Sequence, residues 1–313
     1  MTAEVNQVSG EAQTVLVAGG TGMLGGRIAA HLLEEPGIQL RLLLRPGTLQ
    51  DPTKGPALEP LLRGGATTAE GELSDATSLE AATDGVDVVV SAVQGGREVI
   101  VDGQIALAEA ASRSGVRRIL PSDYALDLFK ATPGEHANFD LRREADEVIA
   151  GTGLEHVHVL NGAFMDGFLG PYGGLFDHDA HTASYWGAGE EAFDATSVED
   201  TARYTARAAL DPGLSSGKFA VAAQQLTFGA VVDAVEEATG HTYTRHSLGS
   251  AADLRTKITA ACEAGASSTD VVMQVYLLYM LTGQTALEDL QNDRYPDIHP
   301  QTLTDLARRA LTP

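Results

Sequence analysis

A glycine-rich turn between an apolar strand and a helix limits most strongly how this chain can fold. The run TVLVA at residues 14–18 is short and apolar, and Gly19, Gly22 and Gly25 follow it before an apolar-periodic stretch that reaches Glu35. Glycines at this spacing permit a tight turn, close approach of the backbone to a pyrophosphate, and close helix–strand packing. The helix N-terminus then faces the phosphate. The residues predicted to contact a dinucleotide here are Gly19, Thr21, Gly22, Met23, Leu24 and Gly25.

Apolar runs and helical segments alternate along the first half of the chain. Helices are expected over 98–114 and 139–150. Further strands are expected over 39–44, 66–68, 86–93, 117–120 and 156–160. Continuous apolar strands that alternate with helices are typical of a parallel sheet covered on both faces. The sequence therefore predicts an α/β fold with a doubly wound parallel (Rossmann) sheet and a smaller, mostly helical C-terminal substrate domain.

The alternation ends after Asn161. Residues 162–190 are rich in Gly, Asp, His and aromatic residues, and we expect them to be irregular. Beyond them, Ser197-x-x-Asp200 predicts a capped helix to about Leu210, 218–222 a strand, and 227–240 a helix. The expected divisions are a cofactor-binding domain over 14–161 with about 192–222, a substrate-covering domain over 162–191 and 223–313, and a disordered arm over 1–13.

The charge of the chain excludes two classes of partner. Its 21 basic and 43 acidic residues give a net charge of −22, which argues against binding to nucleic acid and to anionic membranes. A single cysteine, Cys262, excludes a disulfide framework. Segment 177–181 holds metal-capable side chains without zinc-protease spacing, so we expect a solvated loop or pocket lip and no metal. The N-terminus lacks signal-peptide features, so a cytoplasmic protein with a small-molecule substrate is expected.

Basic residues after the second predicted strand indicate which dinucleotide is bound. Arg45 ends that strand, where an NAD site usually has an acidic residue for the ribose hydroxyls. A guanidinium suits a 2′-phosphate because it donates charge-assisted hydrogen bonds to an anion. Lys54, and alternatively Arg41, could add a second positive charge. We therefore expect NADP(H), bound by Arg45 and Lys54; surface charge that serves solubility is the alternative.

The ends of the later strands supply candidates for the reaction centre. Ligands of doubly wound sheets lie at the carboxyl ends of the strands. Tyr124 could donate a proton if a nearby cation lowered its pKa, and Lys130 or ordered water could supply the proton instead. A packed tyrosine ring and an exposed loop lysine are the alternatives. The residues expected beside the ribose and nicotinamide are Ala92, Val93, Gln94, Pro121, Ser122 and Asn161.

Several motifs together resemble the NmrA-like and isoflavone-reductase-like branch of the atypical short-chain dehydrogenases. They are VLVAGGTGMLGG (15–26), LLLRPG (42–47), GELSDATSLEAATDGVDVVVSAVQG (71–95), ILPSDYALDL (119–128), FDLRREADEVIAGTG (139–153), VLNGAFMDG (159–167) and YWGAGEEAFDATSVEDTARYTARAAL (185–210). The resemblance implies a doubly wound sheet with a small substrate-covering domain. It also implies reduction, by NADPH hydride, of a small and often aromatic, unsaturated or ether-bearing substrate.

One position departs from the pattern of that family. The family places a lysine in an F-x-x-K motif on a helix, and Arg142 stands at the matching position after Phe139. Arginine stays protonated and makes a poor proton shuttle. Arg142 is instead a candidate for holding an anionic substrate, and pairing with acidic helix neighbours is the alternative. Asp123 and Phe164 complete the substrate candidates, although Asp123 would also serve as a loop cap.

Two functions follow from these observations. The first is an NADP(H)-dependent oxidoreductase that reduces a small carbonyl or unsaturated substrate, aromatic substrates included. The second is a non-catalytic, redox-sensing regulator that binds NAD(P) and acts through a protein partner, as some NmrA-like proteins do. The missing lysine favours the regulator, whereas the PSDY segment and the full C-terminal region favour the enzyme. NADPH consumption distinguishes the two.

Overall fold

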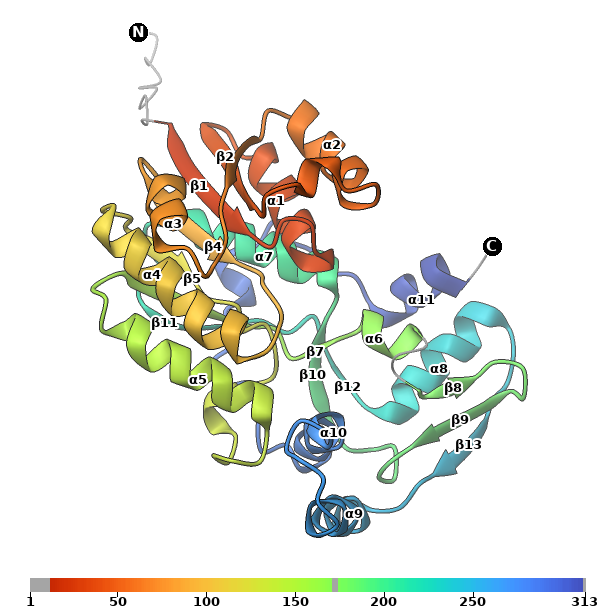
Figure 1. Cartoon of the computed structure of the whole chain (residues 1–313). Coiled ribbons are helices and arrows are strands. Elements are labelled where there is room, and N and C mark those ends of the chain that lie inside the picture. The colour runs from red at the N-terminus through yellow and green to blue at the C-terminus, as the bar shows by residue number, and fades with distance from the viewer. Residues whose placement is uncertain (1–11, 171–173, 312–313) are drawn as a thin grey trace, which may run out of the picture.

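A seven-stranded parallel sheet forms the larger part of the molecule (Figure 1). The computed structural model describes residues 12–170 and 174–311, so most of the predicted N-terminal arm lies outside the described residues. The strand order is β11-β6-β5-β4-β1-β2-β3, and β1 pairs with both β2 and β4. This order confirms the predicted doubly wound sheet. The strands are β1 (Gln13–Ala18), β2 (Ile38–Leu44), β3 (Thr67–Glu70), β4 (Val88–Ser91), β5 (Arg118–Leu120), β6 (Glu155–Leu160) and β11 (Gly217–Ala220).

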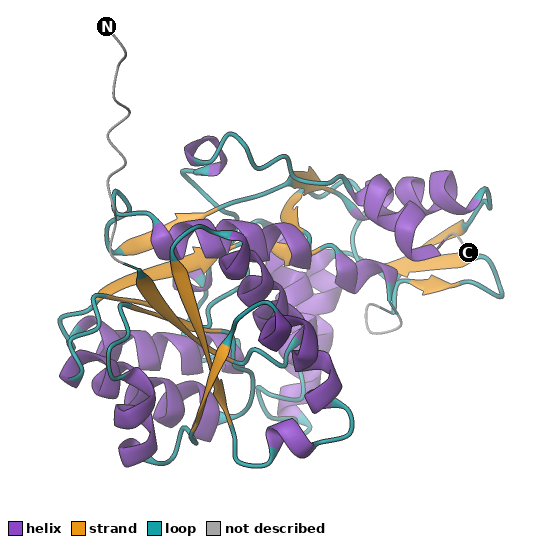
Figure 2. Ribbon diagram, turned by 90° about the horizontal axis from the view of Figure 1, so that it is seen from above, coloured by secondary structure: helices purple, strands orange, loops and turns teal. Residues whose placement is uncertain are grey.

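Helices cover both faces of this sheet, as the view from above shows (Figure 2). Each face has its own apolar core, because successive side chains of a strand point to opposite faces. One core joins the sheet to α1 (Met23–Glu34), α2 (Lys54–Arg63) and α7 (Val198–Leu210). The other joins it to α3 (Ala76–Thr83), α4 (Gln104–Arg113) and α5 (Ala137–Ala150). A π-helical segment over Glu98–Gly103 leads into α4, where the sequence predicts ordinary helix.

Side-chain caps fix the later helices as the sequence predicts. The Asp200 backbone N–H donates to the Ser197 hydroxyl at 3.0 Å, so α7 begins at the expected residue. Thr227 caps α8 (Phe228–Thr239) in the same way. Gly240 ends α8 with a φ of +72°, a left-handed conformation that glycine adopts readily. Within the described residues, no helix has both the length and the apolar character needed to cross a bilayer.

Residues 162–190 are more regular than the sequence predicts. The segment forms the short elements β7 (Ala163–Phe164), α6 (Asp166–Leu169), β8 (Phe176–Asp177) and β9 (Thr182–Tyr185). These strands join two small sheets, β12-β10-β7 and β13-β9-β8, through the partners β10 (Phe193–Thr196), β12 (Gln224–Leu226) and β13 (Thr244–Ser247). Strands of two to four residues carry too little alternation to be recognised in the sequence.

A third apolar core lies under the C-terminal helices. It gathers residues of β7, β9 and β10 with those of α8, α9 (Ala251–Glu263), α10 (Val272–Thr282) and α11 (Leu303–Leu311). These helices confirm the predicted helical C-terminal region. His178 lies 2.7 Å from the Tyr243 hydroxyl and His181 stacks on His241, so these histidines of the expected pocket lip pack against aromatic neighbours.

A fully buried arginine ties the central sheet to α7. Arg118 of β5 has no exposed surface, and its guanidinium donates to the carbonyl oxygens of Ala208, Asp211 and Leu214 at 2.6–2.9 Å. Its Nε also donates to Glu155 at 2.9 Å. These carbonyls lie at or beyond the end of α7, where a helix leaves acceptors without partners. The arginine therefore satisfies several buried acceptors at once.

A buried cluster of two carboxyl groups and an imidazole lies between β5, β6 and α5. Asp123, Asp146 and His158 each offer an atom within 4.8 Å of the others. The Nδ1 atom of His158 is 2.7 Å from Asp123 Oδ2 and 3.7 Å from Asp146 Oδ1. Burial raises the pKa of Asp146 well above its ordinary value, and the Asp123 charge raises it further. The folded protein therefore keeps a proton on this pair of carboxyl groups.

We expect Asp146→Asn to change how stability depends on pH. The folded-state pKa of Asp146 lies above its unfolded value, so the stabilising contribution of its proton is complete in acid and is lost as pH rises towards the folded pKa. An asparagine cannot ionise and avoids this loss. The free energy of unfolding is measured in urea from pH 5 to 8 for both proteins. The difference, variant minus wild type, should increase by up to roughly 1.4 kcal/mol for each unit that the pH rises. A difference that does not vary with pH contradicts a protonated Asp146.

Candidate active site

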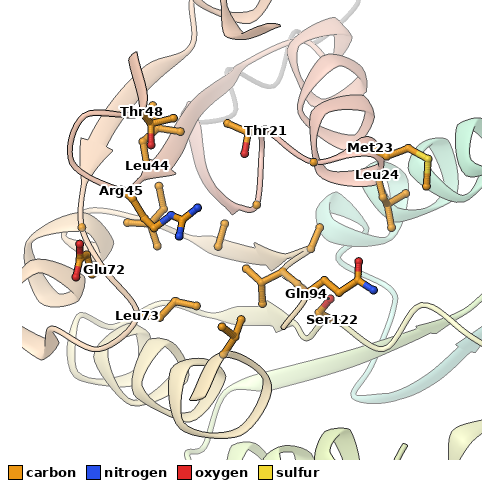
Figure 3. Close-up of a pocket in the computed structure, with 18 of the residues that line it drawn as sticks. Thr21, Met23, Leu24, Leu44, Arg45, Thr48, Glu72, Leu73, Gln94 and Ser122 are labelled. Carbon is orange, nitrogen blue, oxygen red and sulfur yellow. Dashed lines mark hydrogen bonds between the residues drawn. The ribbon is translucent and has the colours of Figure 1, made fainter. Parts of the chain in front are cut away.

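A cavity of about 700 Å³ opens at the carboxyl ends of the central strands (Figure 3). Loops that follow β1, β2, β3, β4 and β5 line it, together with residues of α1, α2 and α5. This is the edge where a doubly wound sheet binds its ligand, beside the point at which the strand order reverses. The predicted site residues that line it are Gly19, Thr21, Gly22, Met23, Leu24, Arg45, Lys54, Ala92, Val93, Gln94, Ser122, Tyr124, Arg142 and Phe164.

The three predicted glycines have different tasks. Gly19 has a φ of +91°, and a Cβ there would lie 2.4 Å from the carbonyl oxygen of Ala92. A Cβ on Gly25 would lie 2.3 Å from the Gly19 oxygen, and Gly25 does not line the cavity. The structure thus corrects its expected cofactor contact, because close packing of α1 on the turn requires this glycine.

Gly22 is the glycine that faces the cavity at the start of α1. A Cβ there would meet only the Gly19 oxygen, at 3.2 Å, a tight contact that a shift of a few tenths of an ångström would relieve. Gly22 is the N-cap of α1 and makes no side-chain capping bond, and no other side chain within residues 12–170 and 174–311 accepts from the first N–H groups of this helix. Unpaired N–H groups and the helix dipole make such an end suitable for a phosphate. The structure therefore fits a pyrophosphate at this position.

Two cations line the other end of the cavity. Arg45 follows β2 directly, and its side chain points into the space bounded by Thr21 and Glu72 (Figure 3). Lys54, the first residue of α2, also lines the cavity. Arg41 lies elsewhere, because its guanidinium donates to the carbonyls of Ala82 and Asp84 at 2.8 and 2.7 Å. Arg45 and Lys54 are thus the members of the predicted basic group that can meet a phosphate in the cavity.

Hydrogen bonds join the loops that follow β4 and β5. The Ser122 hydroxyl donates to the Val93 carbonyl at 2.8 Å, and the Ser122 N–H donates to Gln104 Oε1 at 2.8 Å. Both loops therefore present Ala92, Gln94 and Ser122 as one wall. Pro121 and Asn161 do not line this cavity, so their expected contacts stay predictions. Asn161 is fully buried, and its backbone N–H donates to Ala125 at 3.1 Å.

Tyr124, the expected proton donor, has its hydroxyl group buried among protein atoms. Its side chain contributes to the cavity wall, but its hydroxyl oxygen is covered and has no hydrogen-bond partner within residues 12–170 and 174–311. Burial raises the pKa of this hydroxyl, and the neighbouring Asp123 charge raises it further. The expectation of a lowered pKa is therefore wrong, because burial and the Asp123 charge both raise the pKa.

Two more candidates lie away from the cavity. The Lys130 ammonium donates to the Ala286 carbonyl at 2.7 Å and lies 2.9 Å from Glu288, so it ties its loop to the C-terminal region. Asp123 is fully buried with His158 and does not line the cavity. Both side chains have protein partners and neither lines the cavity, so nothing in this geometry supports the roles expected of them.

Arg142 and Phe164 do line the cavity, as predicted for substrate contacts. Arg142 Nε donates to the Ser122 carbonyl at 2.7 Å, and Nη1 donates to the Asn138 carbonyl at 3.1 Å. Burial lowers the pKa of its guanidinium, while the charges of Asp123 and Asp146 oppose that effect. An arginine remains cationic at neutral pH even so. The expected ion pair with helix neighbours is not formed within the described residues.

Some residues that line the cavity were not predicted from the sequence. Thr48 follows β2, residues 71–74 follow β3, and Glu98 and Val99 begin the π-helical segment. Their only common signal is a position after a predicted strand end. The third strand has only a weak apolar pattern in the sequence, so the sequence does not predict that the loop after it forms a wall of the site.

Comparisons with known proteins agree with this geometry. A model of the NmrA-like family matches residues 11–291. Pinoresinol reductase 2 of Arabidopsis thaliana is 35% identical over 212 residues, which are 65% of this chain and 66% of that protein. The chain therefore matches about two thirds of the length of that relative. Isoflavone reductase homolog A622 of Nicotiana glauca is 30% identical over 245 residues, 75% of this chain and 77% of that protein.

A solved structure shares the whole fold. AtPrR2 with NADP+ and (+)pinoresinol superposes with a TM-score of 0.82 at 27% identity, covering 96% of this chain and 100% of that chain. The family match, the relatives and the doubly wound sheet with its glycine turn agree. This chain belongs to the NmrA-like family.

Proposed function

We propose that this protein is an NADP(H)-dependent reductase of a small carbonyl or unsaturated substrate, aromatic substrates included. The observation that carries the proposal is a single cavity lined by the open end of α1 and Arg45 after β2, and also by Phe164 and Arg142, which is bonded to the loop after β5 on the other side of β1 and β4. Related proteins are named as reductases, and one is solved with NADP+ and pinoresinol. A dinucleotide and a small substrate can therefore meet in one space.

The residues present fit NADP(H) part by part. The free N–H groups after Gly22 would hold the pyrophosphate, and Arg45 with Lys54 would hold the 2′-phosphate. Gln94 and Ser122 would flank the nicotinamide ribose. NADPH supplies a hydride when it is bound. Residues 14–161 with 192–222 would then form the cofactor-binding part, and 162–191 with 223–313 the part that covers the substrate.

A non-catalytic regulator that binds NADP(H) is the second candidate. Arg142 favours it, because a guanidinium stands where the family has an ionisable lysine. The two candidates differ in turnover rather than in cofactor binding. Calorimetry should show NADPH binding in either case. Oxidation of NADPH with quinones, enones or aldehydes, followed at 340 nm, supports the enzyme, and binding without turnover of any acceptor supports the regulator.

Arg45→Ala should weaken NADPH binding and leave NADH binding nearly unchanged. The lost charge-assisted hydrogen bonds to the 2′-phosphate are worth about 1.5–3 kcal/mol. Calorimetric titration of both cofactors measures this difference. Arg41→Ala is the matched control, since it removes the same charge from a guanidinium that is turned away from the cavity. Equal losses for NADPH and NADH, or equal effects of the two variants, contradict the assignment.

Gly22→Val and Gly25→Ala should fail for different reasons. The valine Cβ presses only on the Gly19 oxygen, which a small shift relieves, and its side chain occupies the phosphate position, so the variant should fold with at most a slightly lower melting temperature and lose NADPH binding. The alanine at 25 would collide with the Gly19 oxygen, so that variant should lose stability. Thermal unfolding and NADPH titration of both variants separate the two effects. A folded Gly22→Val protein that binds NADPH normally argues against a phosphate at this turn.

Tyr124→Phe should leave turnover almost intact. The buried hydroxyl has no partner among the described residues, so its removal should be neutral or slightly stabilising. A general acid is typically worth roughly 10²–10⁴-fold in rate. We therefore expect a decrease in kcat well below that range, with unchanged NADPH affinity. A loss of kcat within that range would restore Tyr124 as the proton donor.

A further inference from the structure

Arg142 is held in one orientation at the substrate end of the cavity. Its Nε donates to the Ser122 carbonyl at 2.7 Å, and its Nη1 donates to the Asn138 carbonyl at 3.1 Å. One of these acceptors belongs to the loop after β5 and the other to the first turn of α5. Its Nη2 donates to no acceptor within the described ranges. The planar guanidinium is therefore fixed while part of its donor capacity remains available to the cavity.

The charge of Arg142 has no partner in direct contact. Its neighbour Arg143 pairs with Asp140, whereas no carboxylate of the described residues lies within 4.0 Å of Arg142. Asp123 is bonded to His158 instead. Burial, and then the charge of Arg142, lowers the pKa of the nearby His136 to about 4, so this histidine is neutral at pH 7. Asp123 and Asp146 act on this cation only through space, so an anionic oxygen in the cavity would be the first acceptor to form a charged hydrogen bond with it.

We propose that Arg142 binds the substrate oxygen that becomes negatively charged during reduction, and that the substrate is a conjugated carbonyl compound, an enone or a quinone. This proposal rests on the reductase function proposed above. Hydride from NADPH forms a C–H bond at a carbon conjugated to the carbonyl. The π electrons move to the carbonyl oxygen, which becomes an enolate or phenolate, and NADPH is oxidised to NADP+. A proton from water then neutralises the reduced product.

The surroundings of Arg142 favour these acceptors over saturated carbonyls. A guanidinium keeps its proton at neutral pH, and the Tyr124 hydroxyl is covered by protein. A saturated aldehyde or ketone would give an alkoxide, which is far more basic and needs a proton donor during hydride transfer. An enolate or a hydroquinone anion is a weaker base and needs charge stabilisation instead. Fixed donors at the developing oxyanion supply that stabilisation.

The first experiment compares matched acceptors with the full chain. NADPH oxidation is measured with 1,4-naphthoquinone and 4-phenyl-3-buten-2-one, and with the saturated ketone 4-phenyl-2-butanone. We expect kcat/KM for the conjugated acceptors to exceed that of the saturated ketone at least tenfold. Reduction of the saturated ketone at an equal or higher rate overturns the proposed substrate class but leaves the reductase function standing. No turnover of any acceptor, with NADPH bound, overturns both.

The second experiment tests the residue. Arg142→Met should decrease kcat with the conjugated acceptors by roughly 10²–10³-fold, the effect of removing an oxyanion donor, while NADPH affinity is unchanged. Arg142→Lys keeps the charge and should retain part of the activity. Arg143→Met is the control, since that arginine pairs with Asp140 and donates to Ala131 outside the cavity. Normal kcat in Arg142→Met contradicts the proposal.

A binding measurement gives a readout that does not depend on turnover. The coloured 4-nitrophenolate serves as an analogue of the anionic product in the complex with NADP+. The wild type should bind the phenolate in preference to the neutral phenol, which lowers the apparent pKa of the bound dye. Arg142→Met should bind phenolate at least tenfold more weakly, whereas Arg143→Met should match the wild type. Equal binding of phenolate by Arg142→Met and the wild type overturns the anion site even if the reductase is active.

Discussion

The arrangement of the whole site depends on the contact between three backbone segments at Gly19. The Cα of this glycine lies against the carbonyl of Ala92, and its own oxygen lies where a side chain at position 25 would be. β1, the loop after β4 and the first turn of α1 therefore approach one another without an intervening side chain. This contact sets the direction of α1, and with it the position of the unpaired N–H groups that open into the cavity.

The two ends of that cavity carry positive charge in a strongly acidic chain. Arg45 follows β2 and Arg142 is bonded to the loop after β5, on opposite sides of β1 and β4, although the net charge of the protein is −22. They differ in how they are held: Arg45 is exposed after β2, whereas Arg142 is fixed by two carbonyl groups. The exposed cation suits an anion that arrives from solvent. The fixed cation suits an oxygen whose charge appears only during a reaction.

Features encoded in short stretches of sequence could be predicted, whereas side-chain directions in loops could not. The glycine turn, the Ser197 cap and the strand order follow from local patterns and the rules of parallel sheets. Tyr124 and Lys130 both follow β5, but no local pattern shows that the Tyr124 hydroxyl is buried or that the Lys130 ammonium reaches the Ala286 carbonyl. Those directions depend on segments that are distant in the sequence, such as the one around Ala286. The short strands β7, β8 and β9 were not predicted because each has only two to four residues, and β7 and β9 also pair with strands that come much later in the chain.

The place of β11 in the sheet has a consequence for how the chain is assembled during synthesis. β11 pairs with β6, register Gly217 to Val157, so the outer edge of β6 lacks its neighbour until a long later segment has left the ribosome. The carbonyls that Arg118 binds, at Ala208 to Leu214, arrive in the same late segment. The strands that shape the cofactor end, β1 to β5, are all made earlier. A nascent chain can therefore form its cofactor pocket while β6 still presents an open edge, the kind of surface that chaperones shield from aggregation.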